Sequence, residues 1–368
     1  MKTAIVHDWL TGMRGGEKVL EVLCELYPSA DLITLLYNKG TLSQTIENMN
    51  IHTSFIDKLP FKETKYRNYL PLFPAAIRSL NFNKYDLILS TSHCVAKGAL
   101  PRKNALHICY CHTPMRYVWE MYDEYFGKDA AGVLTRMAMS IIAPKLRRWD
   151  VQTNTRVHHF IANSNFVAGR IKNYYNRVAD VIYPPVDTSL FHLSQKNDDY
   201  FLIVSALVPY KKVHLAIEVF NKTGRKLIVV GTGPESERLK SFAKSNIEFL
   251  GWRDNNELAN LYAGCRALIF PGIEDFGIVP LEAMASGKPV IAFRKGGALE
   301  TIIDEGELKT GMFFNNQTYD DLINSLIRFD KLSFNSQEIR NHALKFDRAQ
   351  FKKKIKDYID LKIANKQE

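Results

Sequence analysis

The stretch EDFGIVPLEAMASG, residues 274–287, contains two glutamates separated by seven residues around a Phe-Gly turn. It follows the apolar run ALIFPG (267–272), which has the length and composition of a buried strand. Gly287 is typical of a helix end and Pro280 is tolerated in a first helical turn, so a short helix is expected over 279–286. This order of strand, loop and helix predicts a parallel α/β sheet for this half of the chain.

Glu274 and Glu282 are expected at the carboxyl edge of that sheet, where open α/β folds bind their ligands. The backbone N–H groups of the Phe276-Gly277-Ile278 loop and of the first helical turn are available to an anion. Carboxylates accept hydrogen bonds from hydroxyls, so the pair suits a polyol such as a sugar or a ribose. Alternatively, Glu274 is solvated and Glu282 only supports the helix terminus, which is the more common outcome for two isolated glutamates.

The rest of the chain repeats the alternation of short apolar runs and helical patterns. In the first half, helix 19–27 follows the glycine-bearing turn 11–18. Strands are expected at 3–10, 31–37, 85–91, 105–112 and 158–164, and in the second half at 201–207, 226–233, 247–252, 267–272 and 289–293. The polar stretch SQKNDD (194–199) has the composition of a linker.

The pattern predicts an α/β protein with two Rossmann-like, doubly wound parallel-sheet domains. Residues 1–190 form the first domain and residues 198–346 the second, and a last helix over 348–364 is expected to pack back on the first domain. Two such domains joined by one linker imply a ligand cleft between them, lined by the loops at the carboxyl edges of both sheets.

The composition is that of a soluble globular protein. Of 368 residues, 46% are hydrophobic and 24% are charged, and the length suits two domains. The five cysteines are odd in number and scattered, which indicates a reducing compartment and no disulfide framework. The N-terminal apolar run is too short for a signal peptide, and no run approaches the roughly 20 residues of a membrane span. We therefore expect a cytoplasmic protein.

The net charge of +10 is compatible with a nucleic acid, an anionic lipid surface or a phosphorylated small molecule, and also with an ordinary solvated surface. Lysines near 58–67 and 352–356 lie beside aromatic residues and leucines, which favours a membrane surface over nucleic acid. We expect no nucleic-acid partner and a peripheral contact with the inner face of the cell membrane through segment 58–80. The alternative is that this segment is a loop and helix covering the sheet.

Three further features follow predicted strands. Lys211 and Lys212 come just before a helix, where ammonium groups and a helix N-terminus together would bind a diphosphate. Gly15 and Gly16 in GGEK would let a ligand approach the backbone closely, although the run is not GxGxxG. His112 should emerge at the carboxyl end of its strand. Taken alone, each feature has an ordinary explanation. The lysines are a solvated pair, the glycines form a tight turn, and the histidine is structural.

Together the motifs form an ordered set that covers nearly the whole chain, and residues 201–302 are the most specific part. The set is GGEK, CHTPMRYVWE, ANSNFVAGRI, VIYPPVDTSLF, SALVPYKK, VVGTGPE, FLGWRDNNELANLYAGC, IFPGIEDFGIVPLEAMASGKPVIA and GGALETI. It resembles the retaining glycosyltransferases of family 4, which have the GT-B fold.

The resemblance implies a catalytic set in which Glu274 contacts the donor sugar, Lys211 neutralises the leaving diphosphate and His112 lies near the transferred sugar. It also implies donor-binding residues, with Glu282 at the ribose and backbone amides around 276–278 at the sugar and diphosphate. The family often has an arginine where this chain has Ala206, and either Lys212 or the pair Arg294 and Lys295 is the expected substitute. The donor-binding residues are Gly15, Gly16, Lys212, Phe276, Gly277, Ile278, Val279 and Glu282.

Departure of a nucleoside diphosphate leaves positive character on the sugar and negative charge on the phosphate, so fixed N–H groups and a lysine stabilise the transition state. The chain has no Asp-x-Asp, the usual metal-chelating signature, and we expect no metal and no cofactor. Retention, with attack on the face of the leaving group, is what the resemblance implies.

The stretch HTPMRYVWEMYDEYF, with VPYKK, is similar to mannosyltransferases that build bacterial surface polysaccharides such as lipopolysaccharide. The expected partners are therefore a nucleotide sugar donor, with GDP-mannose as the first choice, and a saccharide or polyprenyl-linked saccharide acceptor. A sugar-nucleotide epimerase, a phosphorylase of the same fold and an inactive nucleotide-sugar-binding protein remain alternatives. A Rossmann oxidoreductase is disfavoured because GxGxxG is absent.

Overall fold

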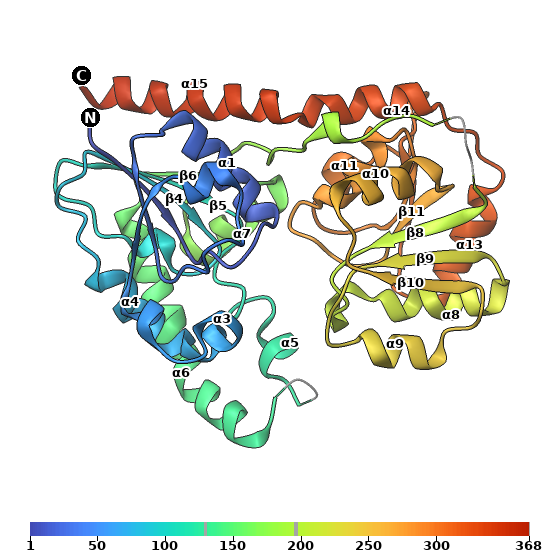
Figure 1. The fold of residues 1–368 in the computed structure, drawn as a ribbon, viewed down its shortest axis with the longest axis horizontal. Coiled ribbons are helices and arrows are strands. Elements are labelled where there is room, and N and C mark those ends of the chain that lie inside the picture. The colour runs from blue at the N-terminus through green and yellow to red at the C-terminus, as the bar shows by residue number, and fades with distance from the viewer. Residues whose placement is uncertain (129–130, 195–197, 368) are drawn as a thin grey trace. The chain divides into compact units, whose positions relative to one another are not determined.

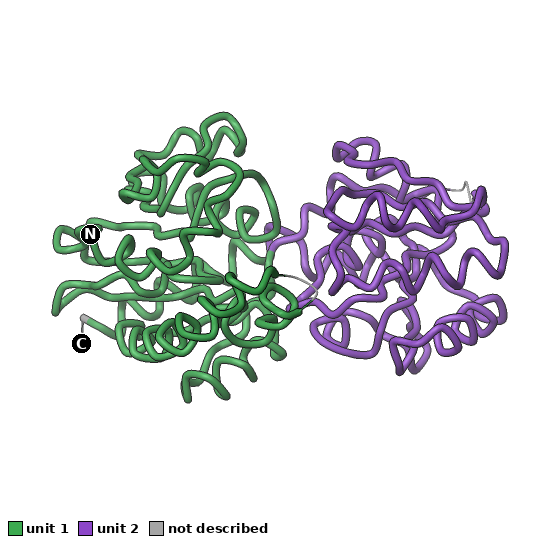
Figure 2. Tube along the Cα trace, turned by 90° about the horizontal axis from the view of Figure 1, so that it is seen from below, with its two compact units in different colours: residues 1–184, 351–368 green, residues 185–350 purple. Residues whose placement is uncertain are grey.

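The computed structural model describes residues 1–128, 131–194 and 198–367 (Figure 1). The chain divides into two compact units, residues 1–184 with 351–368, and residues 185–350 (Figure 2). Each unit has one parallel sheet with helices around it, so the predicted fold of two Rossmann-like parallel-sheet domains is confirmed. The middle of the predicted linker, residues 195–197, lies outside the described residues.

Unit 1 contains a seven-stranded sheet in the order β3-β2-β1-β4-β5-β6-β7. Every neighbouring pair is parallel, which is the arrangement that strand-helix-strand crossovers produce. The strands are β1 (Thr3–His7), β2 (Asp31–Thr34), β3 (Asn50–Thr53), β4 (Leu87–Ser92), β5 (Leu106–Cys111), β6 (His159–Ala162) and β7 (Ala179–Val181).

The longer helices of unit 1 bury apolar side chains in its core. The helices are α1 (Gly15–Leu26), α2 (Gln44–Glu47), α3 (Lys62–Lys65), α4 (Phe73–Ser79), α5 (Tyr122–Phe126), α6 (Val133–Thr153) and α7 (Asn165–Tyr175), and α15 (Arg348–Gln367) closes the chain. In α15, Phe351, Ile355 and Ile359 recur every four residues, so they share one helix face, and all three are buried in the same core cluster as the inner face of α1.

Unit 2 contains a six-stranded parallel sheet in the order β10-β9-β8-β11-β12-β13. Its strands are β8 (Tyr200–Val204), β9 (Lys226–Val230), β10 (Ile247–Gly251), β11 (Ala267–Phe270), β12 (Val290–Phe293) and β13 (Gly311–Phe314). Its helices are α8 (Val213–Thr223), α9 (Ser236–Phe242), α10 (Asn255–Gly264), α11 (Ile278–Ala285), α12 (Ala298–Thr301), α13 (Tyr319–Phe329) and α14 (Ser336–Ala343). The β11–loop–α11 unit is the stretch from which the sequence analysis began.

Helix α1 begins earlier than predicted, because Gly15 and Gly16 are its first two residues and do not form a turn before it. The side chain of Glu17 accepts a hydrogen bond from the N–H of Arg14, at 3.1 Å, and so closes the first turn at that point. The two glycines are therefore part of a helix N-terminus.

Segment 58–80, the predicted membrane contact, folds into α3, a 3₁₀ helix (Tyr66–Leu72) and α4. Tyr66, Leu70 and Phe73 are buried in a core cluster of unit 1, while Phe61 is exposed. Most of the large apolar side chains of this segment thus contribute to the core. In the described part of the chain, no helix combines the length and the apolar character that crossing a membrane requires.

Candidate active site

The predicted site residues lie where the strand order of each sheet reverses. In unit 1 the order reverses between β1 and β4, and in unit 2 between β8 and β11. Ligands of open α/β sheets bind outside the carboxyl ends of the strands at such a switch point. Lys211 follows β8 and Glu274 follows β11, whereas Gly16 follows β1 in unit 1.

Lys211 and Glu274 form an ion pair at the switch point of unit 2. Lys211 ends a short 3₁₀ helix (Pro209–Lys211), and Glu274 lies in the loop between β11 and α11. Their side chains are 15% and 24% exposed, so the two charges are partly shielded from water and attract each other more strongly than a surface pair would. The structure thus brings together two of the three residues predicted to be catalytic.

Two glycines hold the loop that carries Glu274 by direct contact with its backbone. The N–H of Gly297 donates a hydrogen bond to the carbonyl of Glu274 at 2.9 Å. A Cβ atom on Gly297 would lie 2.3 Å from the Cα of Phe276, and one on Gly296 would lie 2.4 Å from the Glu274 carbonyl oxygen. Gly296 also has a φ of +76°. Only glycine permits this approach, so both residues position the loop.

Helix α11 begins directly after this loop. Its N-cap, Gly277, has a φ of +90°, which glycine adopts without steric cost. The N–H groups of Ile278 and Val279 have no acceptor within the helix, and the helix dipole adds a positive partial charge at this end. The side chain of Phe276 is buried near the ring of Phe346, so Phe276 presents its backbone to the site and not its ring. The first turn is suited to bind a phosphate.

Glu282, in the second turn of α11, is oriented by a buried tyrosine. The hydroxyl of Tyr262, in α10, donates a hydrogen bond to the Glu282 carboxylate at 2.9 Å. Burial, followed by the charge of Glu282, raises the pKa of Tyr262 well above its ordinary value. The tyrosine therefore stays protonated and acts as the donor. Sequence reasoning missed this partner, which comes from a different helix.

The loop between β8 and α8 carries Ala206 and Lys212. Gly231 and Gly233, after β9, pack against its main chain, since Cβ atoms on them would lie 1.9 and 2.2 Å from carbonyl oxygens of the loop. Ala206 is exposed, and Lys212 caps α8 with a φ of +55°, which is uncommon for a residue other than glycine. The loop is thus packed closely against the β9 loop, with Lys212 at a helix N-terminus.

Histidines and carboxylates gather at the carboxyl edge of the sheet in unit 1. The Nδ1 atom of His7 is hydrogen-bonded to the hydroxyl of Thr91 on the neighbouring strand, and its Nε2 lies 3.6 Å from the Glu17 carboxylate. His7 ends β1, and Glu17 lies in the first turn of α1. The imidazole of His7 is therefore held between β4 and α1.

Asp8 fixes the loop that follows β4. Its carboxylate accepts hydrogen bonds from four consecutive backbone N–H groups, those of residues 93–96, at 2.6–2.9 Å. The same carboxylate lies 3.1 Å from the Nδ1 of His93 and is fully buried. A buried carboxylate with this many donors is well satisfied, so Asp8 is a rigid support for His93.

His112 lies one residue beyond β5, as predicted. Its N–H donates to the Ser92 carbonyl at 2.8 Å, and its ring centroid lies 6.3 Å from that of His93. A Cβ on Gly16 would lie 3.6 Å from the Nε2 of His112 and 3.7 Å from the Cε1 of His7. The imidazoles of His7 and His112 therefore both approach the start of α1 at Gly16. In the described residues, no set of three or more His, Cys, Asp or Glu side chains could hold a metal ion.

Burial keeps two of these imidazoles neutral at pH 7. It lowers the pKa of His93 to about 3, and the charges of His7 and Arg116 act in the same direction. Burial, with the charges of His93 and His7, also lowers the pKa of His112 well below its ordinary value. For Glu17, burial raises the pKa, but the hydrogen bond and charge of His7 outweigh it and the net pKa is lowered. The site therefore presents neutral imidazoles beside an ionised carboxylate.

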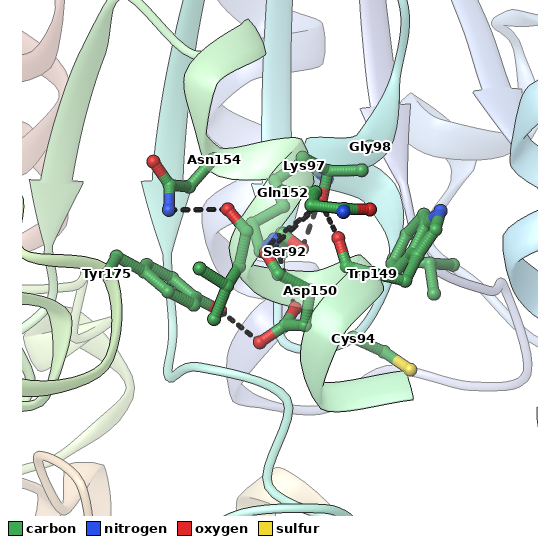
Figure 3. Close-up of polar contacts among 12 residues, drawn as sticks. Ser92, Cys94, Lys97, Gly98, Trp149, Asp150, Gln152, Asn154 and Tyr175 are labelled. Carbon is green, nitrogen blue, oxygen red and sulfur yellow. Dashed lines mark hydrogen bonds and ion pairs between the residues drawn. The ribbon is translucent and has the colours of Figure 1, made fainter. Parts of the chain in front are cut away.

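A buried ion pair between Lys97 and Asp150 supports the loop that follows β4 (Figure 3). The Nζ of Lys97 lies 3.0 Å from the Asp150 carboxylate and donates to the Asp150 carbonyl and to the Thr153 hydroxyl, at 2.6 and 2.9 Å. Tyr175 and Trp119 each donate to the other oxygen of Asp150 at 2.8 Å. The network connects α6 and α7 to the turn after β4. We therefore interpret it as structural support for the cluster of His7, His93 and His112.

Two family models match the chain and together span most of it. The glycosyltransferase family 4 model matches residues 15–190, and the glycosyl transferases group 1 model matches residues 189–346. Both halves of the chain thus match glycosyltransferase models, which supports a GT-B glycosyltransferase of family 4.

Relatives of this glycosyltransferase include the O-antigen chain mannosyltransferase RfbU of Salmonella typhimurium, 34% identical over 37% of this chain and 42% of that protein. The alpha-1,3/1,6-mannosyltransferase ALG2 of Saccharomyces cerevisiae is 28% identical over 71% of this chain and 66% of that protein. The matches thus span less than half of the first relative and about two thirds of the second.

Among solved structures, HepE of Anabaena in complex with UDP superposes with a TM-score of 0.72 and 18% identity over 98% of this chain and all of that chain. This likeness supports the GT-B fold.

The structure places the predicted residues of this glycosyltransferase in two groups. The group at the switch point of unit 2 consists of Lys211, Lys212, Glu274, Glu282 and the amides of 276–279. The group at the switch point of unit 1 consists of Gly15, Gly16 and His112. Sequence reasoning missed His7, Asp8, Glu17 and His93. The signal was present, since His7 ends the apolar strand β1, Asp8 follows it, and His93 directly follows the apolar strand β4.

Proposed function

We propose that this glycosyltransferase moves a hexosyl group from a nucleotide sugar to a saccharide acceptor with retention of configuration. The observation that carries the proposal is the Lys211–Glu274 ion pair beside the first turn of α11, at the switch point of unit 2. A lysine, helix N-terminal amides and a carboxylate at one place match the two parts of a nucleotide sugar that flank its reactive bond. The diphosphate takes the lysine and the amides, and the sugar hydroxyls take the carboxylate.

In this proposal the chain stabilises charge that develops as the bond between sugar and diphosphate breaks. The amides of Ile278 and Val279 and the ammonium of Lys211 stabilise the leaving diphosphate, so they act most strongly in the transition state. Glu274 accepts hydrogen bonds from the sugar, and Glu282, oriented by Tyr262, accepts them from the ribose. No metal is required, because the lysine and the helix dipole carry out the neutralisation.

We assign His112 the role of a neutral hydrogen-bonding partner for a sugar hydroxyl. Its lowered pKa supports this assignment, because an uncharged imidazole both donates and accepts hydrogen bonds at pH 7. The acceptor hydroxyl attacks on the face that the diphosphate leaves, and its proton goes to a diphosphate oxygen. Gly16, beside His112, allows a substrate to approach the start of α1 closely.

The donor that we propose is GDP-mannose, and the acceptor is a saccharide or polyprenyl-linked saccharide of a bacterial surface polysaccharide. The mannosyltransferase relatives support the sugar. The fold neighbour HepE is in complex with UDP, whereas the proposed donor is a GDP-sugar. The nucleotide base of the donor must therefore be identified by experiment.

A thermal-shift panel of GDP-, UDP- and ADP-sugars tests the donor. A ligand at 100 times its Kd stabilises the protein that binds it by about 2.7 kcal/mol. GDP-mannose should raise the melting temperature most in wild type and less in Glu274→Gln, which keeps the size of the side chain and removes its charge. If no nucleotide sugar shifts the melting temperature, the proposal fails. Transfer assays with excess EDTA test the metal-free mechanism, which fails if activity is lost and magnesium restores it.

A further inference from the structure

Helix α6 presents an apolar stripe to solvent. Four of its large apolar side chains, those of Val133, Leu134, Met137 and Ile141, are between 63% and 83% exposed. At 100° per residue these four positions fall within one face of the helix. The opposite face contributes Met139, Ala143 and Leu146 to a core cluster of unit 1. The stripe is therefore the outer face of a helix whose inner face is already packed.

The first half of α6 is held less tightly than the second half. Only Met139 among residues 133–141 is buried, whereas Leu146, Trp149 and Asp150 of the second half are buried. Pro144, between the two halves, has no N–H to bond the carbonyl four residues earlier. In Figure 1 the first turns of α6 extend away from the sheet of unit 1. The stripe is thus carried on turns that project from the unit.

The exposed charges of this helix are all positive, since its one acidic residue, Asp150, is buried and paired with Lys97. Between Val133 and Trp149 the sequence has Arg136, Lys145, Arg147 and Arg148 and no acidic residue. Lys145 and Arg148 are exposed and continue the same helix face by one to two turns beyond Ile141. An apolar face bordered by basic side chains is the pattern of a helix that lies in the headgroup region of an anionic bilayer.

We propose that α6 docks this glycosyltransferase on an anionic membrane surface, with the Val133–Ile141 stripe in the acyl boundary and Lys145 and Arg148 at the lipid phosphates. The charge favours this occupant over a second copy of the chain. In a two-fold contact, antiparallel helices would bring each basic end to the positive dipole end of the partner, and parallel helices would bring the two basic ends together. In either case α6 has no acidic residue between Val133 and Trp149 to compensate. This surface differs from segment 58–80, and it does not depend on the identity of the donor.

Vesicle sedimentation without donor or acceptor tests the proposal. The full chain should bind vesicles of phosphatidylcholine with 30% phosphatidylglycerol, and it should bind pure phosphatidylcholine more weakly, by about fivefold for each basic residue at the surface. Leu134→Gln/Met137→Gln should weaken binding to the anionic vesicles by at least about tenfold. Lys145→Gln/Arg148→Gln should remove most of the preference for the anionic lipid.

The matched control is Val178→Gln/Leu361→Gln, which changes two exposed apolar residues elsewhere in unit 1 and should bind vesicles like wild type. All variants lie at exposed positions, so their thermal unfolding should match wild type, which separates lost binding from lost folding. The proposal is overturned if wild type does not bind anionic vesicles or if the α6 apolar variant binds them like wild type. It is also overturned if wild type is a dimer in solution that the Leu134→Gln/Met137→Gln pair converts to a monomer.

Failure of this proposal and failure of the proposed activity are distinguishable. Nucleotide-sugar binding by thermal shift does not require α6, so the variants should retain the wild-type shift. A chain that binds vesicles through α6 and no nucleotide sugar would refute only the proposed activity. A chain that binds a nucleotide sugar and no vesicle would refute only the membrane-docking role of α6.

Discussion

Gly297→Ala tests whether backbone contact positions the Glu274 loop. Gly297 has a φ of −63° and a ψ of −17°, which alanine adopts freely, so the substitution adds a methyl group without backbone strain. That carbon would lie 2.3 Å from the Cα of Phe276 and 2.7 Å from the carbonyl oxygen of Asp275. Because ordinary contacts begin at 3.4 Å, the loop must move by about 1 Å.

A shift of about 1 Å at a reacting centre costs about 10²-fold in rate. It also lengthens the 2.9 Å hydrogen bond from Gly297 to the Glu274 carbonyl beyond bonding distance. We expect kcat for transfer to fall by about two orders of magnitude, and overpacking to lower the free energy of unfolding by about 1–3 kcal/mol. The assays are initial rates with saturating donor and urea unfolding of the same preparation.

The matched control is Gly169→Ala in α7, where an added Cβ meets no atom within 4 Å. It should leave the rate unchanged and stabilise the protein by about 0.5–1 kcal/mol, since alanine is the better helix former. If Gly297→Ala retains kcat within twofold of wild type with unchanged stability, the inference that these glycines hold the site is refuted.

Three further predictions concern the partners of the two sites. Lys97→Met, which leaves Asp150 buried without its cation, should lower the free energy of unfolding by about 3–5 kcal/mol in urea, and adding Asp150→Asn should restore part of it; an unchanged midpoint for the single variant would contradict the network. Tyr262→Phe removes a hydrogen bond to a carboxylate and should raise the donor KM by about tenfold with a smaller effect on kcat, so an unchanged KM would exclude Tyr262 from positioning Glu282. Acid should destabilise the protein below pH 6.5, because a histidine whose pKa is lowered in the folded state binds fewer protons there than in the unfolded state. The slope of unfolding free energy between pH 6 and 5 should be about 1.4 kcal/mol per pH unit for each such histidine, and a flat slope would contradict burial of neutral His93, His107 and His112.

Much of the fold could be predicted from sequence because most central strands are short apolar runs with turn residues after them. β3 (Asn50–Thr53) and β7 (Ala179–Val181) were not predicted, since they lie at the edges of their sheet and expose part of their side chains. Edge strands take their register from one neighbour, so their own sequence needs little apolar character. β13 was also missed, although GMFF is buried, because four residues give no periodicity.

The site was only partly predictable for a different reason. Lys211 and Glu274 follow strands, so their place at one sheet edge comes from the topology. The glycines that hold their loop could not be found in this way, because Gly297 contacts a backbone 21 residues earlier in the chain. Lys97 and Asp150 are 53 residues apart and lie on different elements, so no local pattern pairs them.

The side chains at the two switch points differ in their charge state, and this difference links the fold to the proposed chemistry. In unit 2 a lysine, a carboxylate and a helix dipole are assembled at one edge, so the chain itself supplies the charge that a departing diphosphate needs. In unit 1 burial keeps His93 and His112 uncharged, and Asp8 satisfies its own charge with four backbone N–H groups. Uncharged imidazoles suit sugar hydroxyls, which need hydrogen bonds in both directions. Because protonating these imidazoles opposes folding, acid should weaken the structure that holds His93 and His112 in unit 1.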